Sequence, residues 1–420
     1  MYRSNLTEEE TDELMVELSQ KRAFRLSSQF NYAFKNREAT HSNKSTYPDV
    51  LTPFLGPAFD SVFIVEVRIG TPPQKFYLEF DTGSDLIWVQ CAGCIDCFDV
   101  HLGNFEYSKS STYQLVSCGH PSCDPDDCKE GICTAKVSYA DGGYTQGPLS
   151  KDDFQFFSLD KGVQTVNGVF FGCSLRSSIA WGENIGRIAG IFGMGTDPNS
   201  FISQLGTQGQ RRRFSYCLRK ADNRPGRSYN YLRFGEDAVF PAGSDVRTTP
   251  MVEGPFGVYY YVNLNDISVN SIRLGLPPDT FRIRDDETGG IVLDTGTSTT
   301  YIFSDAYNRL VARLKEVLAP YNLRPYLRNN KPMKRLCYVR PPGFNNFPSI
   351  TFHFDGADFE PYHETTYSIT NDRFCLQIRP TDVIQNLDVS IFGSFFLAEQ
   401  YFVHDNEQRT ISFARADCSK

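Results

Sequence analysis

Short apolar runs interrupted by polar residues and turn residues dominate the chain from Val62 onwards. The clearest pair of runs covers Phe63 to Ile69 and Phe76 to Phe80, separated by the turn sequence Gly70-Thr71-Pro72-Pro73. Alternation with a period of two is typical of strands that bury one face, while Gly and Pro favour turns. The pattern therefore predicts a β-hairpin at this point and a body that is mostly β.

One segment instead has the apolar spacing of a helix. Between Ser304 and Leu318 the apolar residues recur every three or four positions and form one stripe: Ala306, Leu310, Val311, Leu314, Val317 and Leu318. Such a stripe is typical of an amphipathic helix that packs on a core. We expect Ser304 to cap this helix with its hydroxyl, because serine is favoured at that position.

The first 57 residues differ from the rest of the chain. They are polar, contain no cysteine and end in a proline-punctuated stretch from Tyr47 to Pro53. Segments of this kind are typical of linkers. The pattern predicts a separable leader and linker over residues 1–57 and a compact body that starts near Ala58.

Composition and charge exclude several classes of protein. With 420 residues, 40% hydrophobic and 22% charged, the chain has the composition of an ordered globular protein of two or three domains. The net charge of −8 and the lack of a long basic block argue against nucleic acid as a partner. No apolar run approaches the roughly 20 residues that span a bilayer, so we expect no membrane span.

Cysteine usage indicates an oxidising compartment. The chain has 12 cysteines, an even number, and seven of them fall between Cys91 and Cys133. Such density is usual in secreted proteins, yet the first 25 residues lack the apolar stretch of a secretory signal. We expect the chain to begin inside a precursor whose signal has been removed, and the protein to be secreted or vacuolar, with a plastid as the alternative.

The cysteine-rich segment 91–133 has two interpretations. Cys91, Cys94 and Cys97 have a spacing found in zinc sites, with His101 or His120 as further ligands. The remaining cysteines of the segment follow at regular five-residue steps: Cys118, Cys123, Cys128 and Cys133. Because the ligand count is odd and the even total lets every cysteine pair, we favour disulfides and expect no bound metal.

An internal repeat is the most informative feature of the sequence. Asp81-Thr82-Gly83-Ser84 follows one apolar run, and Asp294-Thr295-Gly296-Thr297 follows another in the second half of the chain. Each copy is followed at a distance by an apolar segment that ends in glycine: Gly190 to Gly193 and Ser390 to Gly393. A single Asp-Thr-Gly is commonly a turn, but two matched copies predict two related lobes. We place these lobes at residues 58–245 and 246–420.

The repeat would bring two carboxylates together. If the lobes are related by an approximate two-fold axis, Asp81 and Asp294 meet there and share one proton, because like charges so close cannot both ionise. The ionised member can take a proton from water as the water attacks a peptide carbonyl, and the protonated member can donate to the oxyanion. This chemistry needs no cofactor, metal or covalent intermediate. Ser84 and Thr297 are placed to hydrogen-bond the outer carboxylate oxygens, the alternative being ordinary turn solvation.

Taken together, these motifs resemble the pepsin-like aspartic proteases, and among them the cysteine-rich plant branch typified by the nepenthesins. The resemblance spans residues 58–420, and the segments that carry it are Ile69 to Gln74, Phe80 to Cys91, Phe171 to Cys173, Phe214 to Leu218, Leu293 to Thr297 and Ile391 to Phe395. It implies an all-β fold of two lobes with a substrate cleft between them. It also implies an endopeptidase that cleaves proteins at acid pH, is made as a proenzyme, is inhibited by pepstatin-type compounds and is a monomer.

The resemblance assigns a flap, the hairpin of the N-terminal lobe that closes over substrate, to residues near 139–147. Tyr139-Ala140-Asp141-Gly142-Gly143 matches the flap motif, so Tyr139 is the expected flap tyrosine and Trp88 its expected hydrogen-bond partner, with Asp141 and Gly142 as further flap residues. The alternative interpretation of Tyr139 alone is an aromatic residue of a strand, and its position within the motif favours the flap. Ala140 departs from the family pattern, where glycine is usual, and is expected to stiffen the flap.

The resemblance also implies two disulfides outside the cysteine-rich segment, Cys217 with Cys418 and Cys337 with Cys375. The pairing within the segment stays open, and Cys173 is the one remaining cysteine outside it. The leader resembles the end of a propeptide, which in this family covers the cleft at neutral pH and is lost in acid. Its basic residues are expected to contact cleft carboxylates until those protonate: Lys21, Arg22, Arg25, Lys35 and Arg37.

Two other functions fit parts of the sequence. Plant binding proteins such as the xylanase inhibitors use the same fold without catalytic groups, but this chain retains both aspartates, the glycines that follow them and Tyr139. Gly190-x2-Gly193-x-Gly195 is rich in glycine as nucleotide-binding loops are, but its spacing is not the dinucleotide fingerprint. We therefore expect an enzyme that acts on protein or peptide substrates.

Overall fold

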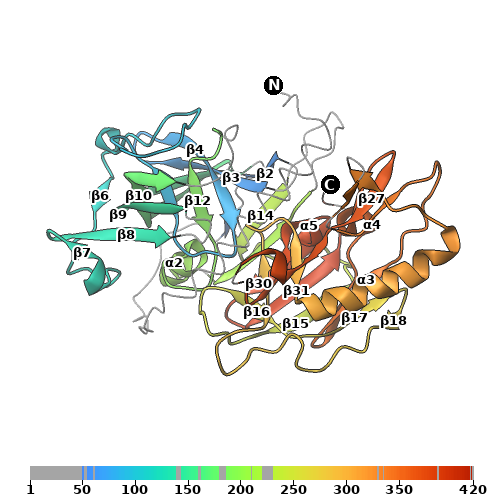
Figure 1. Cartoon of the computed structure of the whole chain (residues 1–420). Coiled ribbons are helices and arrows are strands. Elements are labelled where there is room, and N and C mark those ends of the chain that lie inside the picture. The colour runs from blue at the N-terminus through green and yellow to red at the C-terminus, as the bar shows by residue number, and fades with distance from the viewer. Residues whose placement is uncertain are drawn as a thin grey trace.

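The computed structural model describes residues 50–51, 54–59, 62–138, 143–158, 162–178, 186–209, 211–219, 230–328, 331–333, 335–385, 387–416 and 418. Within them the chain forms two lobes rich in β-strands that lie side by side (Figure 1). The predicted all-β fold with two lobes is confirmed. The first 49 residues and the flap residues Tyr139, Asp141 and Gly142 lie outside the described residues, so their expected roles stay predictions.

The N-terminal lobe is built from antiparallel hairpins around an apolar core. The predicted hairpin is confirmed: β3 (Val62–Ile69) and β4 (Gln74–Asp81) pair with Val65 opposite Leu78, and both side chains are fully buried. Gly70, in the turn, has a φ of +92°, a conformation that favours glycine. The other elements of this lobe are β5 (Trp88–Gln90), η1 (Tyr107–Lys109), β6 (Gln114–Leu115), η2 (Pro125–Asp127), β7 (Cys128–Lys129), β8 (Ile132–Ser138), β9 (Tyr144–Ser158), β10 (Gly162–Ser174), β11 (Arg176–Ser178), β12 (Gly190–Gly193), α2 (Phe201–Thr207), β13 (Arg213–Cys217) and β14 (Asn230–Gly235).

The sheet begins earlier in the chain than the sequence pattern suggested. β1 (Val50–Leu51) pairs with β14, and β2 (Phe54–Phe59) pairs with both β14 and β3. The expected boundary at residue 57 therefore falls inside β2. Strand pairing uses backbone N–H and C=O groups, so a short apolar stretch interrupted by Pro53 and Pro57 can join a sheet without an alternating side-chain pattern.

The C-terminal lobe contains the longest helix among the described residues. α3 spans Ser304–Leu318 as predicted, and Ala306, Leu310 and Leu314 of its apolar stripe are fully buried. The expected cap is wrong: Phe303 is the N-cap residue, and no side chain caps the helix, because Ser304 already lies in the first turn. The other elements of this lobe are β15 (Arg247–Val252), β16 (Tyr260–Val262), β17 (Leu264–Val269), β18 (Ile272–Arg273), β19 (Ile291–Asp294), β20 (Thr300–Ile302), η3 (Ala319–Tyr321), β21 (Leu327–Arg328), β22 (Lys331–Pro332), β23 (Cys337–Val339), β24 (Ile350–Phe354), β25 (Ala357–Phe359), α4 (His363–Thr366), β26 (Tyr367–Ile369), β27 (Arg373–Leu376), β28 (Ile378–Pro380), η4 (Thr381–Val383), β29 (Ser390–Gly393), α5 (Ser394–Leu397), β30 (Gln400–Asp405) and β31 (Thr410–Arg415).

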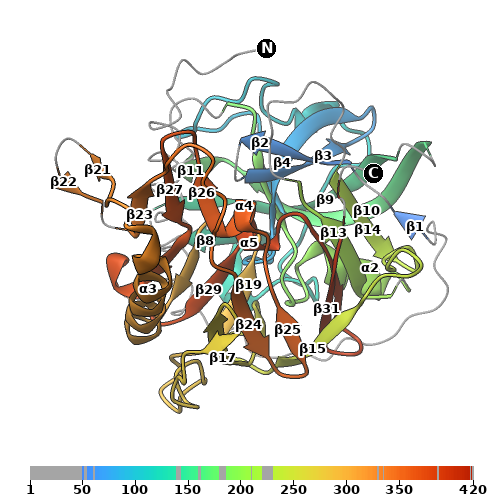
Figure 2. The same ribbon diagram turned by 90° about the vertical axis from the view of Figure 1, so that its right-hand side faces the viewer.

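An antiparallel sheet joins the two lobes. Its strands run in the order β14, β13, β30, β31 and β15, so strands from both halves of the chain pair side by side (Figure 1, Figure 2). Tyr216 of β13 is fully buried and stacks on Phe402 of β30. The disulfide between Cys217 and Cys418 links residues 201 positions apart, and in the chain-entropy model a bridge of this span stabilises by about 5 kcal/mol.

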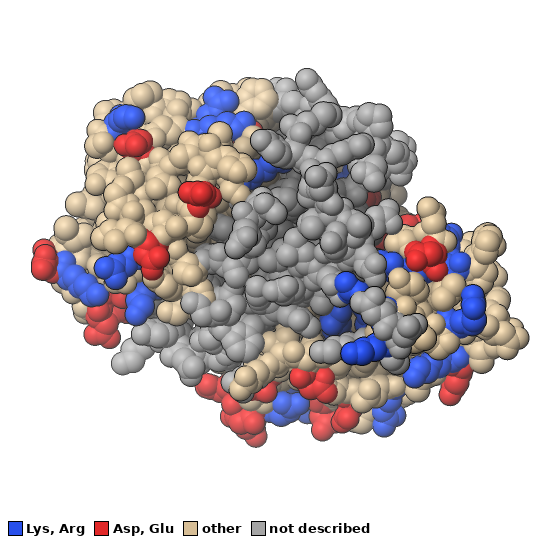
Figure 3. Space-filling view, turned by 45° about the horizontal axis from the view of Figure 1, so that its top comes forward, with Lys and Arg blue, Asp and Glu red and all other residues tan. Residues whose placement is uncertain are grey.

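Charged side chains are spread over the surface. On the face shown in Figure 3, the described Lys and Arg side chains are intermixed with Asp and Glu side chains. Within the part of the chain that the structure describes, no helix has the length and apolar character needed to cross a membrane.

Candidate active site

Each Asp-Thr-Gly sequence lies in a loop at the end of a buried strand. In the N-terminal lobe β4 ends at Asp81, and β12 runs parallel beside it so that Gly193 lies opposite Asp81. In the C-terminal lobe β19 ends at Asp294, and β29 runs parallel beside it so that Gly393 lies opposite Asp294. The repeat in the sequence is therefore also a repeat in the structure.

The two loops interlock through their threonines. The Thr82 N–H donates to Thr295 Oγ1 at 3.0 Å, and the Thr295 N–H donates to Thr82 Oγ1 at 3.0 Å. Each hydroxyl then donates across the interface, Thr82 to the Leu293 carbonyl at 3.2 Å and Thr295 to the Phe80 carbonyl at 3.0 Å. Four buried hydrogen bonds thus fix one loop against the other.

The glycines of the two loops allow the carboxylates to approach each other. The Gly83 N–H donates to Asp81 Oδ1, and the Gly296 N–H donates to Asp294 Oδ1, both at 2.8 Å. A Cβ at Gly83 would lie 2.6 Å from Asp294 Oδ1, and one at Gly296 would collide with Asp81. Each glycine therefore faces the opposite aspartate, and a larger residue would push the pair apart.

The two carboxylates differ in how their second oxygen is held. The Ser84 hydroxyl donates to Asp81 Oδ2 at 2.6 Å, as expected from the sequence. Thr297, its counterpart, is fully buried, and its Oγ1 makes no hydrogen bond of good geometry within the described residues. Thr297 nevertheless lowers the pKa of Asp294, and loss of solvation and the charge of Asp81 oppose it.

Burial makes Asp294 the member of the pair that holds a proton. Asp294 is 2% exposed, whereas Asp81 is 8% exposed. Loss of solvation and, next, the charge of Asp81 raise the pKa of Asp294 to about 8, against opposing contributions from Thr297 and the Gly296 N–H. The geometry therefore presents one hydrogen-bonded carboxylate and one protonated carboxyl side by side, an arrangement suited to general base and general acid catalysis.

Sequence reasoning missed a second acidic pair beside the first loop. Asp85 directly follows Ser84, and its Oδ1 accepts the backbone N–H of Asp197 at 3.0 Å. Loss of solvation and the charge of Asp197 raise the pKa of Asp85, and loss of solvation raises the pKa of Asp197. The available signal was Asp85 itself, a charged residue between the Asp-Thr-Gly-Ser motif and the apolar run that begins at Leu86.

Both strands of the hairpin that is expected to carry the flap are present. β8 and β9 pair with Ser138 opposite Tyr144. Trp88 is fully buried in β5, where its ring packs edge-on against Phe98. Because Tyr139 lies outside the described residues, the expected hydrogen bond between Trp88 and Tyr139 stays a prediction.

All twelve cysteines pair. Two disulfides are those that the family resemblance implied, Cys217–Cys418 and Cys337–Cys375. The other four resolve what the sequence left open: Cys91–Cys173, Cys94–Cys97, Cys118–Cys128 and Cys123–Cys133. Zinc binds thiolates, so sulfurs held in disulfides do not supply the alternative zinc site, and the described residues contain no other cluster of metal ligands.

Packing explains the glycine-rich segment around β12. A Cβ at Gly190 would collide with the backbone of Trp88, and one at Gly193 would collide with the backbone of Asp85. Gly195 faces the carboxyl group of Asp85. These glycines let β12 lie close to the Asp81 loop, so the nucleotide-binding alternative is not needed to account for them.

Comparison with known proteins finds relatives over most of the chain. The family model described as Xylanase inhibitor N-terminal matches residues 63–236, and the one described as Xylanase inhibitor C-terminal matches residues 259–415. Aspartic proteinase nepenthesin-1 of Nepenthes gracilis is 31% identical over 86% of this chain and 79% of its own length. Aspartic proteinase nepenthesin-2 of the same plant is also 31% identical, with the same coverage of both chains.

Solved structures share the fold. The crystal structure of edgp matches with a TM-score of 0.73 and 18% identity, over 90% of this chain and 98% of that one. The crystal structure of basic 7S globulin from soybean matches with a TM-score of 0.68 and 18% identity, over 88% and 97%. At these identities the likeness concerns the fold alone.

Proposed function

The chain belongs to the family of plant aspartic proteinases that includes the nepenthesins, and we propose that it hydrolyses peptide bonds in acid with water activated by Asp81 and Asp294. As a member of this family it is an aspartic-type endopeptidase with the pepsin-like fold. The observation that carries the proposed mechanism is the reciprocal hydrogen bonding of Thr82 and Thr295, which holds the two carboxylates face to face.

The two carboxylates take different roles in this mechanism. Asp81 accepts two hydrogen bonds, from the Gly83 N–H at 2.8 Å and the Ser84 hydroxyl at 2.6 Å, which stabilise its ionised form. It is therefore the general base. Asp294, whose pKa is raised by burial and by Asp81, is the general acid.

The bond changes balance without a covalent intermediate. The water oxygen bonds to the peptide carbonyl carbon while a water proton passes to Asp81 and the Asp294 proton passes to the carbonyl oxygen. This gives a tetrahedral diol. When the C–N bond breaks, the leaving nitrogen takes the proton held by Asp81, and one diol proton returns to Asp294, so the pair ends in its starting state.

A binding function is the alternative that the family descriptions raise. Those descriptions name xylanase inhibitors, and fold alone does not decide between an inhibitor and an enzyme. The site favours the enzyme, because both aspartates are retained and both glycines leave room for a direct approach of the carboxylates. A protein selected only for binding has no need of two carboxylates that face each other.

Further parts of the proposal concern partners, maturation and location. We expect protein or peptide substrates, inhibition by pepstatin-type compounds, a monomer, and a leader over residues 1–57 that acts as the end of a propeptide. The six disulfides support an oxidising compartment, either secreted or vacuolar, with a plastid as the alternative.

Cleavage of a denatured protein at pH ~3 to 4, where such a pair holds one proton, tests the proposed function. After incubation in acid, the chain should cut the protein, pepstatin should stop the reaction, and Asp81→Asn should be inactive. Asp279→Asn, which changes an exposed carboxylate, is the matched control and should remain active. A folded, leader-free chain that fails to cut would favour the binding function instead.

A further inference from the structure

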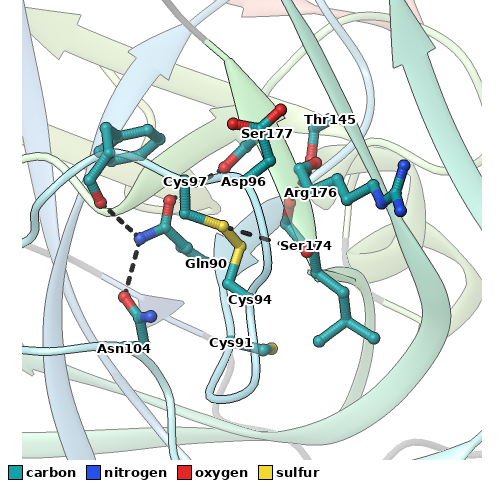
Figure 4. The surroundings of a disulfide bond; sticks show 12 residues. Gln90, Cys91, Cys94, Asp96, Cys97, Asn104, Thr145, Ser174, Arg176 and Ser177 are labelled. Atoms are coloured by element: carbon teal, nitrogen blue, oxygen red, sulfur yellow. Dashed lines mark hydrogen bonds between the residues drawn. A yellow bond between two sulfur atoms is a disulfide. The ribbon is translucent and has the colours of Figure 1, made fainter.

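The loop closed by the Cys94–Cys97 disulfide lies against the strands expected to carry the flap (Figure 4). β9 pairs with β8 on one side and with β11 on the other, with Ser178 of β11 opposite Tyr144 of β9. The hairpin is therefore part of a three-stranded antiparallel arrangement. A contact that holds β11 also holds β9.

The loop is bound to this arrangement through one residue in particular. The Asp96 carbonyl accepts the Ser177 N–H of β11 at 2.8 Å, and the neighbouring Ile95 N–H donates to the Leu175 carbonyl at 2.9 Å. The Asp96 side chain reaches the next strand, where its Oδ2 accepts the Tyr144 hydroxyl at 2.9 Å. Asp96 thus contacts β11 with its backbone and the first residue of β9 with its side chain.

A buried polar network continues this connection into the lobe. Gln90 of β5 is 1% exposed, and its Nε2 donates to the Phe98 carbonyl at 2.7 Å and to Asn104 Oδ1 at 2.8 Å. Its Oε1 accepts the Ser177 hydroxyl at 2.9 Å (Figure 4). A buried amide with partners at both ends fixes the segments that it joins, because each lost bond would leave a buried polar group unpaired.

The same strands lead to the active site. In β5, Trp88 lies opposite Ile191 of β12, and Ile191 lies opposite Glu79 of β4, the strand that ends at Asp81. The cysteine-rich segment therefore links the turn end of the hairpin, at Tyr144, to the strands that carry the first carboxylate.

We propose that Asp96 is a positioning residue that holds the hairpin β8–β9 in place for substrate. A hairpin that is already placed has less freedom to lose when a peptide binds beside it, so the contact lowers KM. The chemical step belongs to Asp81 and Asp294, so kcat is unaffected. The kinetic part of this inference rests on the proposed function, whereas the effect on the hairpin does not.

The test compares Asp96→Ala and Tyr144→Phe with Asp99→Ala, which removes an exposed carboxylate from the same segment. KM and kcat for a peptide substrate are measured on the full chain at acid pH. Asp96→Ala and Tyr144→Phe should each raise KM about three- to tenfold, as expected for one hydrogen bond, and leave kcat within about twofold. The double variant should equal the single ones, Asp96→Asn should restore most of the loss because an amide oxygen still accepts, and Asp99→Ala should match the parent.

Amide hydrogen exchange over residues 132–158 distinguishes failure of this inference from failure of the proposed function. Faster exchange in Asp96→Ala but not in Asp99→Ala supports the positioning role even if no proteolysis is detected. Replacing both Cys94 and Cys97 by alanine opens the loop and should reproduce the Asp96→Ala effect without adding to it. Unchanged amide hydrogen exchange in Asp96→Ala would overturn the inference. So would a fall in kcat in proportion to the fraction of folded protein, with KM unchanged.

Discussion

The two Asp-Thr-Gly loops are alike in their backbone contacts and differ in what surrounds their carboxylates. In each loop the glycine N–H donates to its own aspartate at 2.8 Å, and each threonine accepts the N–H of the other at 3.0 Å. Asp81 also accepts the Ser84 hydroxyl at 2.6 Å, whereas the Thr297 hydroxyl makes no hydrogen bond of good geometry among the described residues, and Asp294 is the more deeply buried. The shared contacts place the pair, and the differences divide base and acid between its members.

This comparison teaches how a repeated fold produces unlike chemistry from few changes. A hydrogen bond to a charged group contributes about 1.5 to 3 kcal/mol, which corresponds to roughly one to two pKa units. The Ser84 hydroxyl is therefore one of the contacts that distinguish the two carboxyl groups. Burial of Asp294 is the largest cause that raises its own pKa, and the charge of Asp81 is the next.

Replacing each carboxylate by an amide breaks the pair most severely. Asp81→Asn removes the general base, and we expect kcat/KM to fall by about 10⁴-fold. Asp294→Asn still offers an N–H to the carbonyl oxygen but has no proton to transfer, and we expect a fall of about 10³-fold. Peptide cleavage at acid pH measures both, with circular dichroism as the check on folding, and a smaller loss for Asp81→Asn would contradict the division of roles.

The pH dependence of stability should separate the two loops next. The pKa of Asp294 is raised in the folded chain, so its contribution to stability is complete below its unfolded pKa near 4 and is lost as pH rises towards about 8. Between these pH values, we expect the free energy of unfolding to fall by roughly 3 to 5 kcal/mol more in the parent than in Asp294→Asn. Denaturant unfolding at each pH measures the difference, and parallel curves for parent and variant would show that Asp294 is not the group that holds the proton.

The crossed threonines test the feature that the loops share. Thr295→Ala leaves the buried Thr82 N–H without its acceptor, which should cost about 1 to 3 kcal/mol of stability. Thr82→Ala should cost a similar amount, because the bonds are reciprocal. Thermal unfolding measures both, Thr295→Ser is the control that keeps the hydroxyl, and a clear inequality between the two alanine variants would argue against a symmetric interlock.

The hydroxyls of Ser84 and Thr297 give the smallest effect and the sharpest contrast. Ser84→Ala removes a hydrogen bond to the carboxylate that acts as the base, and we expect kcat/KM to fall by about tenfold. Thr297→Val removes a group that lowers the pKa of Asp294, so the alkaline limb of kcat/KM should move to higher pH. The pH profiles of both variants measure this contrast, and an unmoved alkaline limb in Thr297→Val would contradict it.

Much of this site could be predicted from the sequence because its parts are local and repeated. The two motifs follow apolar strands, and the spacing from Asp81 to Ser84 allows the hydroxyl to reach the carboxylate within one turn. The helix from Ser304 to Leu318 was equally predictable, since its apolar stripe extends over its whole length. Only its cap was wrong, because capping depends on one residue's backbone angles and not on a pattern.

What could not be predicted depends on contacts between distant residues. The crossing of Thr82 and Thr295 requires both lobes to be in place, and the pairing of Cys91 with Cys173 spans 82 positions. The link from Asp96 to Tyr144 depends on how the Cys94–Cys97 loop folds over β11. β1 and β2 join the sheet through backbone pairing, and their few apolar residues are too interrupted by glycine and proline to show an alternating pattern.

The position of the shared proton is the most direct test of the proposed mechanism. Neutron diffraction from crystals of the deuterated, leader-free chain at pH ~4, where the pair should hold one proton, would locate it. We predict deuterium on the Asp294 carboxyl group and none on Asp81, which accepts from Gly83 and Ser84. Deuterium on Asp81 with Asp294 unprotonated would contradict the assignment of base and acid.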